Sequence, residues 1–279
     1  MTMLSINTNV GALQAARSSY SVNKSMEQSM ERLASGKRVN GAADDAAGLA
    51  IATRLTAEIN GINQGIRNAA DAQGMLAVAE GALEQVHALL LRMRELAVQS
   101  ANETNSSADR NQLQTEVAQL EAEIQRVADD TTWAGITLLA GGLSTGATFQ
   151  IGPRNTDTIV ISLSAIDATT DLDKGGLVLQ NHVSTQDNAM AYIATIDNAI
   201  SIISADRGKY GATMNRLDHA MANLQNVATN LSVAKGRIED ADFAAESSNL
   251  ARTQVLQQAS MAMLAQANAS KQNILSLFQ

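Results

Sequence analysis

One unusually long run of helical periodicity constrains this chain more than any other feature. From Tyr192 to Ile238 apolar residues recur at steps of three and four, and only Arg207 and Lys235 interrupt the frame. The members of this stripe are Ile193, Ile196, Ile200, Ile203, Tyr210, Met214, Leu217, Met221, Leu224, Ala228 and Leu231. At about 1.5 Å of rise per residue, a single helix through this segment would run roughly 65–70 Å. A stripe of that length needs partner helices along its whole extent.

The first half of the chain carries stripes that can supply those partners. They comprise Leu76, Ala79, Leu83, Val86, Leu90, Met93 and Ala97, and then Leu113, Val117, Leu120, Ile124 and Val127. Aromatic residues make up only 3% of the chain, so aliphatic side chains must do the packing. Pro153 is the single proline, so little interrupts a helix. We therefore predict a mainly α fold, an elongated rod of long coiled-coil-like helices formed by the N- and C-terminal segments together.

Breaks in the pattern divide the chain. Residues 1–35 predict a first helix, and the turn-forming segment 35–41 ends it. Further helices are expected at about 42–100, 106–129 and 185–235, with Asp44 and Asp45 near the start of the first of these. A last helix is expected from about Asp242 onward. We assign 1–40 and 238–279 to the two halves of an inner helical domain and 41–237 to a rod domain.

The periodicity falls to two in the middle of the chain. Five glycines punctuate the stretch after Trp133, and Ile159, Ile161 and Leu163 alternate with their neighbours. Residues 148–151 lie on the other side of a turn-rich segment. The pattern predicts a small β-hairpin region within about 137–180.

Charge and composition exclude several classes of protein. A formal net charge of −8 leaves no basic patch for nucleic acid. The absence of cysteine excludes disulfides and thiolate metal sites. No cleavable signal is evident at the start, and we expect no membrane span. Residues 253–270 carry no charge, yet their amide side chains suit a transmembrane span poorly. We expect other copies or subunits to bury this stretch.

No constellation of residues predicts catalysis or a cofactor. The spacing of His87, His182 and His219 matches no metal motif. The segment 141–146 lacks the spacing and the lysine of a phosphate-binding loop. The acidic pairs 44–45 and 129–130 fit solvated helix ends better than acid–base chemistry.

A calcium loop is the one metal motif that part of the chain resembles. Asp240 and Asp242 match its start, but Ala245 and Ala251 stand where the loop needs Gly and Glu. We therefore expect no catalytic, cofactor or metal site, and no enzyme.

Several motifs together closely resemble bacterial flagellin. They lie at the two ends of the chain, within about 4–140 and 190–279, in the expected order. The chief segments are Ile6–Asn9, Asp44–Ala52, Arg67–Ala69, Ala79–Leu83, Arg92–Gln99, Asn215–Arg216, Asn223–Leu224, Arg237–Asp242 and Gln266–Asn268. Departures include Leu91, where the family often has Gln, and Lys271, where Pro is frequent. The middle is very short, so the large outer domains of many flagellins are missing.

The resemblance implies a structural subunit that polymerises with itself into the extracellular flagellar filament used for swimming. It implies export in an unfolded state through the flagellar type III apparatus, which needs no cleavable signal. The implied partners are an export chaperone, the filament cap and hook-junction proteins, with no nucleic acid and no cofactor. The two terminal helices would line the inner tube of the filament.

The resemblance and the uncharged ends together predict contacts between subunits. We expect these at Ile6, Val10, Leu13, Met26, Met30, Leu33, Arg92, Leu96, Glu116, Met261, Leu264, Ile274 and Leu277. By resemblance, Arg92, Leu96 and Glu116 also fall where many flagellins carry the epitope of a vertebrate Toll-like receptor. The alternative for these charges is a solvated, salt-linked helix face.

Two other classes share part of this design. A hook–filament junction protein would agree less well with the motifs at 44–52 and 92–99. A cytosolic signalling coiled coil would carry charged ends and no hairpin.

Overall fold

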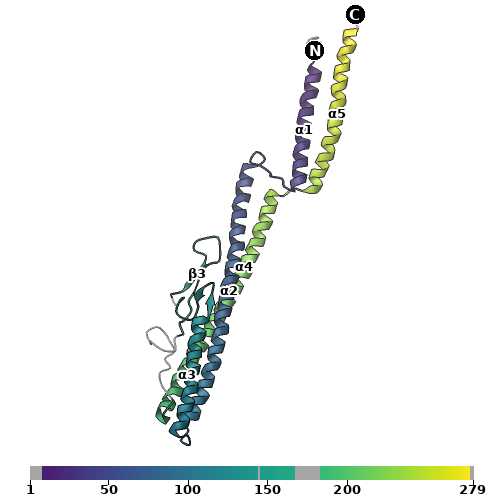
Figure 1. The fold of residues 1–279 in the computed structure, drawn as a ribbon. Helices are drawn as coiled ribbons and strands as arrows, with labels where there is room; N and C mark the ends of the chain where they lie inside the picture. The colour runs from purple at the N-terminus through teal and green to yellow at the C-terminus, as the bar shows by residue number, and fades with distance from the viewer. Residues whose placement is uncertain (1–7, 144, 167–182, 277–279) are drawn as a thin grey trace. The chain divides into compact units, whose positions relative to one another are not determined.

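The fold is mainly α-helical, as the periodicity predicts. The structure, a computed structural model, describes residues 8–143, 145–166 and 183–276, and side chains as far as residue 270. The helices are α1 (Val10–Ser35), α2 (Ala46–Ala101), α3 (Ser107–Asp130), α4 (Gln186–Glu239) and α5 (Phe243–Ser276), shown in Figure 1. Short strands lie between α3 and α4. The predicted fold class, long helices with a small β region in the middle, is confirmed.

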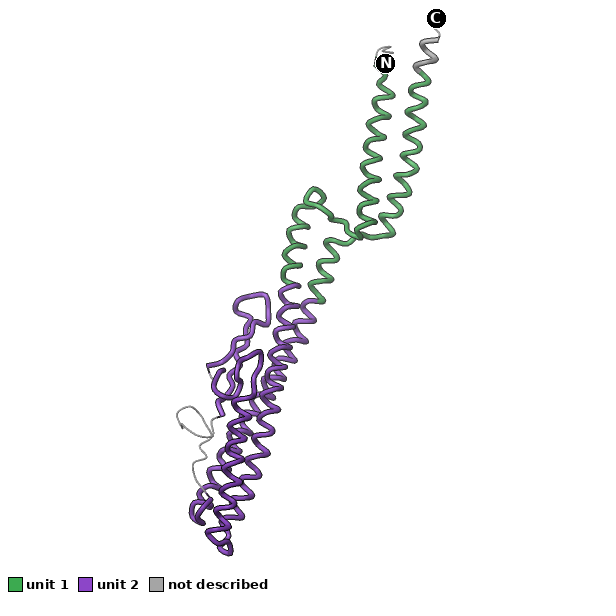
Figure 2. The backbone as a smooth tube through the Cα atoms, viewed as in Figure 1, with its two compact units in different colours: residues 1–59, 229–279 green, residues 60–228 purple. Residues whose placement is uncertain are grey.

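The chain divides into two compact units, which Figure 2 shows in separate colours, and both ends of the chain belong to unit 1. Unit 1 comprises residues 1–59 and 229–279, and unit 2 comprises residues 60–228. The two boundaries fall inside α2 and α4. Our division at residues 40 and 238 remains a prediction.

The core of unit 2 joins α2, α3 and α4. Every member of the predicted stripe from Leu76 to Ala97 is buried in it. From α3 it takes Val117 and Ile124, and from α4 it takes Tyr192, Ile196, Ile203, Tyr210 and Leu217. Burying one such Leu or Ile side chain stabilises the fold by about 1.5–3 kcal/mol. The long stripes are therefore the main source of stability in this unit.

Polar caps decide where the helices begin. The Asn9 side chain accepts from Ala12 N at 3.0 Å, so α1 begins at Val10. The Asp45 carboxylate accepts from Gly48 N at 2.8 Å, so α2 begins at Ala46, later than predicted. At α3, Ser106 and Asp109 form a reciprocal capping box.

The middle of the chain forms two small antiparallel hairpins in unit 2. Strands β3 (Ala147–Gln150) and β4 (Thr158–Ile161) pair with Thr148 opposite Val160, which confirms the predicted hairpin. Ile159 and Ile161 point into the core, as their alternation predicts. A second hairpin, β1 (Thr132–Trp133) with β2 (Ile136–Thr137), was not predicted. Its two turn residues, Ala134 and Gly135, both have positive φ, as a tight two-residue turn requires.

Candidate assembly surface

The helix pair α1 and α5 in unit 1 has an inverted distribution of polarity. The two helices lie side by side (Figure 1). Their buried residues, among those whose side chains are described, are all polar: Ser19, Ser29, Glu246 and Thr253. The pair exposes its large apolar side chains, including Tyr20 at 75%, Phe243 at 71% and Met263 at 66%. A surface of this kind marks a site of association.

Polar contacts along the pair set an antiparallel register. The Asn9 amide donates to Ala267 O at 3.2 Å, and the Gln257 amide donates to Asn23 Oδ1 at 2.9 Å. Such bonds give direction and register, but each contributes only about 0.5–1.5 kcal/mol of net stability. The pair is therefore defined in geometry and weakly held by its own contacts.

Most of the predicted assembly residues of the terminal helices reach this outer surface. Val10, Leu13, Met30 and Met261 are exposed, and Met26, Leu33 and Leu264 are half-buried. Ile6 and Leu277 lie outside the described residues, as does the side chain of Ile274. The exposed members have no apolar neighbour that would remove them from water within the described chain.

A groove runs between α1 and α5 on one side of the pair. Its volume is about 600 Å³, and α1 lines it with Gly11, Ala15 and Ser18 while α5 contributes Ala259, Ser260 and Met263. None of the residues that line this α1–α5 groove is charged. Sequence periodicity gave no sign of it, because a groove depends on how two segments far apart in the chain pack together.

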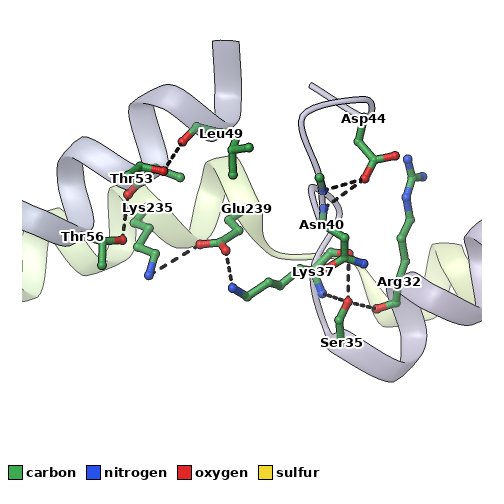
Figure 3. Close-up of polar contacts among 12 residues, drawn as sticks. Arg32, Ser35, Lys37, Asn40, Asp44, Leu49, Thr53, Thr56, Lys235 and Glu239 are labelled. Atoms are coloured by element: carbon green, nitrogen blue, oxygen red, sulfur yellow. Dashed lines mark hydrogen bonds and ion pairs between the residues drawn. The ribbon is translucent and has the colours of Figure 1, made fainter. Parts of the chain in front are cut away.

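Glu239, at the end of α4, holds the segment that follows α1 (Figure 3). Its carboxylate pairs with Lys37 and, at 3.6 Å, with Lys235, while its backbone carbonyl accepts from Arg38 N at 2.6 Å. The hydrogen bond from Lys37 is the main reason that the pKa of Glu239 is lowered. Sequence reasoning missed this clasp.

The carboxylate of Asp44 closes the turn between α1 and α2. It accepts from Asn40 N at 3.1 Å and from Gly41 N at 3.2 Å, as Figure 3 shows. These two bonds lower the pKa of Asp44. Asp44 and Asp45 therefore act on the backbone of the turn and of the helix start, which is a structural role.

Arg92 and Glu116 form an exposed ion pair between α2 and α3 in unit 2. Arg92 Nη2 lies 2.8 Å from Glu116 Oε1, and Arg92 Nη1 lies 3.0 Å from Glu95 Oε2. The hydrogen bond to Glu116 raises the pKa of Arg92. The structure thus brings two of the predicted contact residues together on the surface, about half exposed.

Leu96 does not share that surface. Only 1% of it is exposed, and it packs in the core of unit 2. It follows Met93 by three residues, so it lies on the same helix face as the buried stripe. The prediction that Leu96 touches another subunit or a receptor therefore needs correction: its side chain supports the surface from beneath.

Two further ion pairs join α2 to α4 and were missed. Arg94 Nε lies 2.6 Å from Asp197 Oδ1, and Arg207 Nη2 lies 2.7 Å from Glu80 Oε1. In the sequence, Arg207 shows only as an interruption of the apolar stripe. A charged residue within a buried apolar stripe indicates that an oppositely charged partner is present. The sequence of one segment cannot show which residue that partner is.

The acidic and histidine residues considered as metal ligands do not gather into a metal site within the described part of the chain. Asp242 accepts from Ala244 N at 2.9 Å and so caps α5. Among the described residues, no group of three or more His, Asp and Glu gathers that would hold a metal ion. His182 lies outside the described residues.

Helix α2 is the one described helix that is long and apolar enough to cross a membrane, judged by length and composition. Core helices of water-soluble proteins satisfy the same test. In this chain the apolar residues of α2 between Leu76 and Ala97 are buried against α3 and α4.

Two family regions match the chain at its two ends. The bacterial flagellin N-terminal helical region matches residues 6–144, and the bacterial flagellin C-terminal helical region matches residues 193–278. The chain belongs to the bacterial flagellin family. The β3–β4 hairpin lies between the two matched regions.

Relatives of full length agree with this membership. The chain is 40% identical to a flagellin of Halalkalibacterium halodurans, over 98% of this chain and 99% of that one. It is 37% identical to the flagellar filament 33 kDa core protein of Treponema phagedenis, again over 98% and 99%. Among solved structures, the chain is similar over part of its length to a crystal structure of Bacillus cereus flagellin, with 32% identity, coverage of 61% of this chain and 94% of that chain, and a TM-score of 0.49.

The missed ion pairs connect the two flagellin regions. Arg94 and Glu80 lie in the N-terminal region, and their partners Asp197 and Arg207 lie in the C-terminal region. The clasp between Lys37 and Glu239 does the same in unit 1. The two flagellin regions of this chain therefore fold together as common units.

Proposed function

We propose that this flagellin polymerises with itself into the extracellular flagellar filament and thereby serves swimming motility. The observation that carries the proposal is the inverted α1–α5 pair, in which the buried residues are polar while large apolar side chains are exposed. Burial of apolar surface contributes about 25 cal/mol per Å². Covering the pair with other copies therefore supplies a driving force that the isolated chain lacks.

The charge pattern supports the same proposal. Residues 253–270, which make up most of the described part of α5, carry no charge. Removing a charged group from water would cost several kcal/mol, whereas this segment can be buried without that cost. The surface suits the interior of an assembly better than contact with solvent.

Export and partners follow from family membership as further proposals. We infer that the chain leaves the cell unfolded through the flagellar type III apparatus and meets an export chaperone, the filament cap and hook-junction proteins. A chain without cysteine forms no disulfide that would block threading. No described constellation supports catalysis, so we propose a structural role and no enzymatic activity.

Recognition by a vertebrate Toll-like receptor is a second proposal, with a specific observation in its favour. Arg92 and Glu116 form an exposed, geometrically defined ion pair on unit 2. Leu96 would act only by supporting the helix beneath them. Subunits of the filament would compete for the same surface.

Seeded growth tests the main proposal. Purified full-length chain, dissociated by heat and mixed with filament fragments, is expected to form long filaments above a critical concentration, visible by electron microscopy. Protein that stays monomeric at every concentration, or that forms only short closed assemblies as a junction protein would, contradicts it.

A further inference from the structure

The turn between α1 and α2 contains an asparagine followed by a glycine, Asn40–Gly41, outside any helix or strand. In this dipeptide the backbone nitrogen of the glycine reaches the preceding side-chain amide with little hindrance, because glycine has no Cβ and few conformational restrictions. The same dipeptide occurs as Asn60–Gly61 in the interior of α2. The chain therefore offers the same chemistry in two different structural settings.

In α2 the dipeptide is held by the helix. The backbone nitrogen of Gly61 belongs to the hydrogen-bond ladder of α2, and its backbone has helical dihedral angles. A Cβ on Gly61 would lie 2.8 Å from Cβ of Pro153, so the β3–β4 turn covers this position. Attack by Gly61 on the Asn60 amide would require this part of the helix to open.

In the turn, the two reacting groups are held by exposed hydrogen bonds (Figure 3). The Asp44 carboxylate accepts from Asn40 N at 3.1 Å and from Gly41 N at 3.2 Å, and the Asn40 amide donates to Glu31 O over 3.5 Å. A Cβ on Gly41 would meet nothing within 4 Å, so the surroundings leave space for the turn to move. Release of the Asp44 carboxylate frees the nitrogen that attacks.

We propose that Asn40 is a site of spontaneous deamidation and that the Asp44 carboxylate limits its rate. The Gly41 nitrogen gives its proton to hydroxide and attacks Cγ of Asn40, the bond from Cγ to the side-chain nitrogen breaks, and ammonia leaves. Water then opens the resulting cyclic imide at either carbonyl, which gives aspartate or isoaspartate at position 40. Because the Gly41 nitrogen must first be released, the reaction proceeds from the opened turn.

The product opposes the contacts that hold the turn. A carboxylate at position 40 lies beside the Asp44 carboxylate and near the Glu31 carbonyl at the C-terminal end of α1, where negative charge is unfavourable. The donor to Glu31 O is lost, and isoaspartate adds one carbon to the backbone. The adjacent residue, Val39, is buried and donates to Glu239 O, so the change also reaches the Glu239 clasp. A copy that persists long after its synthesis therefore accumulates a weakened turn.

Peptide mass spectrometry measures both dipeptides in one sample. The full-length monomer is incubated in heavy-oxygen water at mildly alkaline pH, so that only carboxyl groups formed during the incubation carry the label. We expect labelling at Asn40 at least about tenfold faster than at Asn60, because the turn opens more readily than the helix. In denaturant, where neither dipeptide is held, the two asparagines should react at similar rates.

Two variants separate the chemistry from the restraint. Gly41→Ala places a methyl group in open space, so the turn is kept, and the reaction at Asn40 should slow several-fold in native and denatured protein alike. Asp44→Ala removes the acceptor that holds the Gly41 nitrogen, and the native reaction at Asn40 should become about tenfold faster. Asp44→Ala should leave the rate at Asn60 and the denatured rates unchanged.

The consequence for the turn is measured on Asn40→Asp, with Asn40→Gln as the control that keeps an amide. The backbone amides of residues 38–41 should exchange hydrogen faster in Asn40→Asp than in the control. Equal labelling of Asn40 and Asn60 in the native protein, or no labelling of native Asn40 under conditions that label the denatured chain, would overturn the site. An unchanged rate in Asp44→Ala would overturn the role of the carboxylate, and equal exchange in the two position-40 variants would overturn the weakening of the turn.

Discussion

Arg207 donates from both Nε and Nη2 to a single carboxylate oxygen of Glu80, at 2.9 and 2.7 Å. Both side chains are about one-third exposed, and they join α4 to α2 beside the core of unit 2. The pair ties the C-terminal half of the chain to the N-terminal half. It also explains why a cation can interrupt an otherwise apolar stripe.

Removal of one partner should therefore cost more than removal of both. Arg207→Met leaves the Glu80 carboxylate without its cation, and we expect a loss of about 1–2 kcal/mol in the free energy of unfolding, discounted for partial exposure. The double variant with Glu80→Leu should recover part of that loss. Urea unfolding followed by circular dichroism measures both; additive losses would show that the pair has no coupling.

Gly65 of α2 lets the β3–β4 turn approach the helix. A Cβ at this position would lie 2.2 Å from the carbonyl oxygen of Ile151, which is too close for any side chain. Gly65→Ala should displace the hairpin, break the bond from Asn68 Nδ2 to Gln150 O, and lower the melting temperature of unit 2.

Gly81 is the matched control, since a Cβ there meets nothing within 4 Å in the same helix. Gly81→Ala should raise the free energy of unfolding by about 0.5–1 kcal/mol. The two variants should thus change the thermal unfolding of the monomer in opposite directions. Equal effects would mean that the hairpin does not need the close approach.

The Glu239 clasp should respond to acid. The pKa of Glu239 is lowered from the ordinary value of a glutamate, chiefly by the hydrogen bond from Lys37. Its stabilisation is therefore full above the unfolded-state pKa and is lost as the pH falls through the lower, folded-state pKa. A carbon-13 NMR titration of the Glu239 carboxyl is expected to show that lowered pKa. Lys37→Met should raise the pKa of Glu239. An unchanged pKa would mean that another group causes the lowering.

A charge in the uncharged stretch of α5 should block assembly. Leu264 is half-buried against the helix pair, and Leu264→Asp would leave an unpaired charge in a buried contact, at a cost of several kcal/mol by order of magnitude. We expect a steep rise in the critical concentration and little change in the thermal unfolding of unit 2. Leu264→Met keeps the volume and should polymerise normally. Growth of Leu264→Asp at the parent's critical concentration would place this face in solvent.

In the monomer, α1 and α5 should open more readily than unit 2. The buried residues of their interface are polar, whereas Leu76, Leu83 and Leu90 of α2 are fully buried among apolar partners. Hydrogen exchange should therefore be fast in α1 and α5 and slow at 76–97. Uniform protection across the monomer would contradict this ranking.

Periodicity predicted the long helices and most of the core because a stripe of apolar residues is a local property. The stripe from Leu76 to Ala97 and its partner around Ile196 and Ile203 are buried as expected. For Leu96 the two kinds of sequence argument disagree. Its position three residues after Met93 places it on the buried face of the helix, whereas resemblance to the family favours a surface role. Local helix geometry was the better guide there.

Features that depend on two distant segments could not be predicted from either one. The α1–α5 groove, the Glu239 clasp and the partner of Arg207 arise only when segments between 127 and 258 residues apart meet. The β1–β2 hairpin was missed for a different reason. Its strands are two residues each, too short to show an alternating pattern.

Other copies of the chain are expected to cover the outward apolar side chains of the α1–α5 pair. Oxidative footprinting of Tyr20, Phe243, Met261 and Met263, compared between monomer and filament of the same full-length protein, tests it most directly. We predict strong labelling of all four residues in the monomer and marked protection in the filament, with Trp133 as an internal reference in unit 2. Labelling of these residues that is equal in monomer and filament would contradict the account.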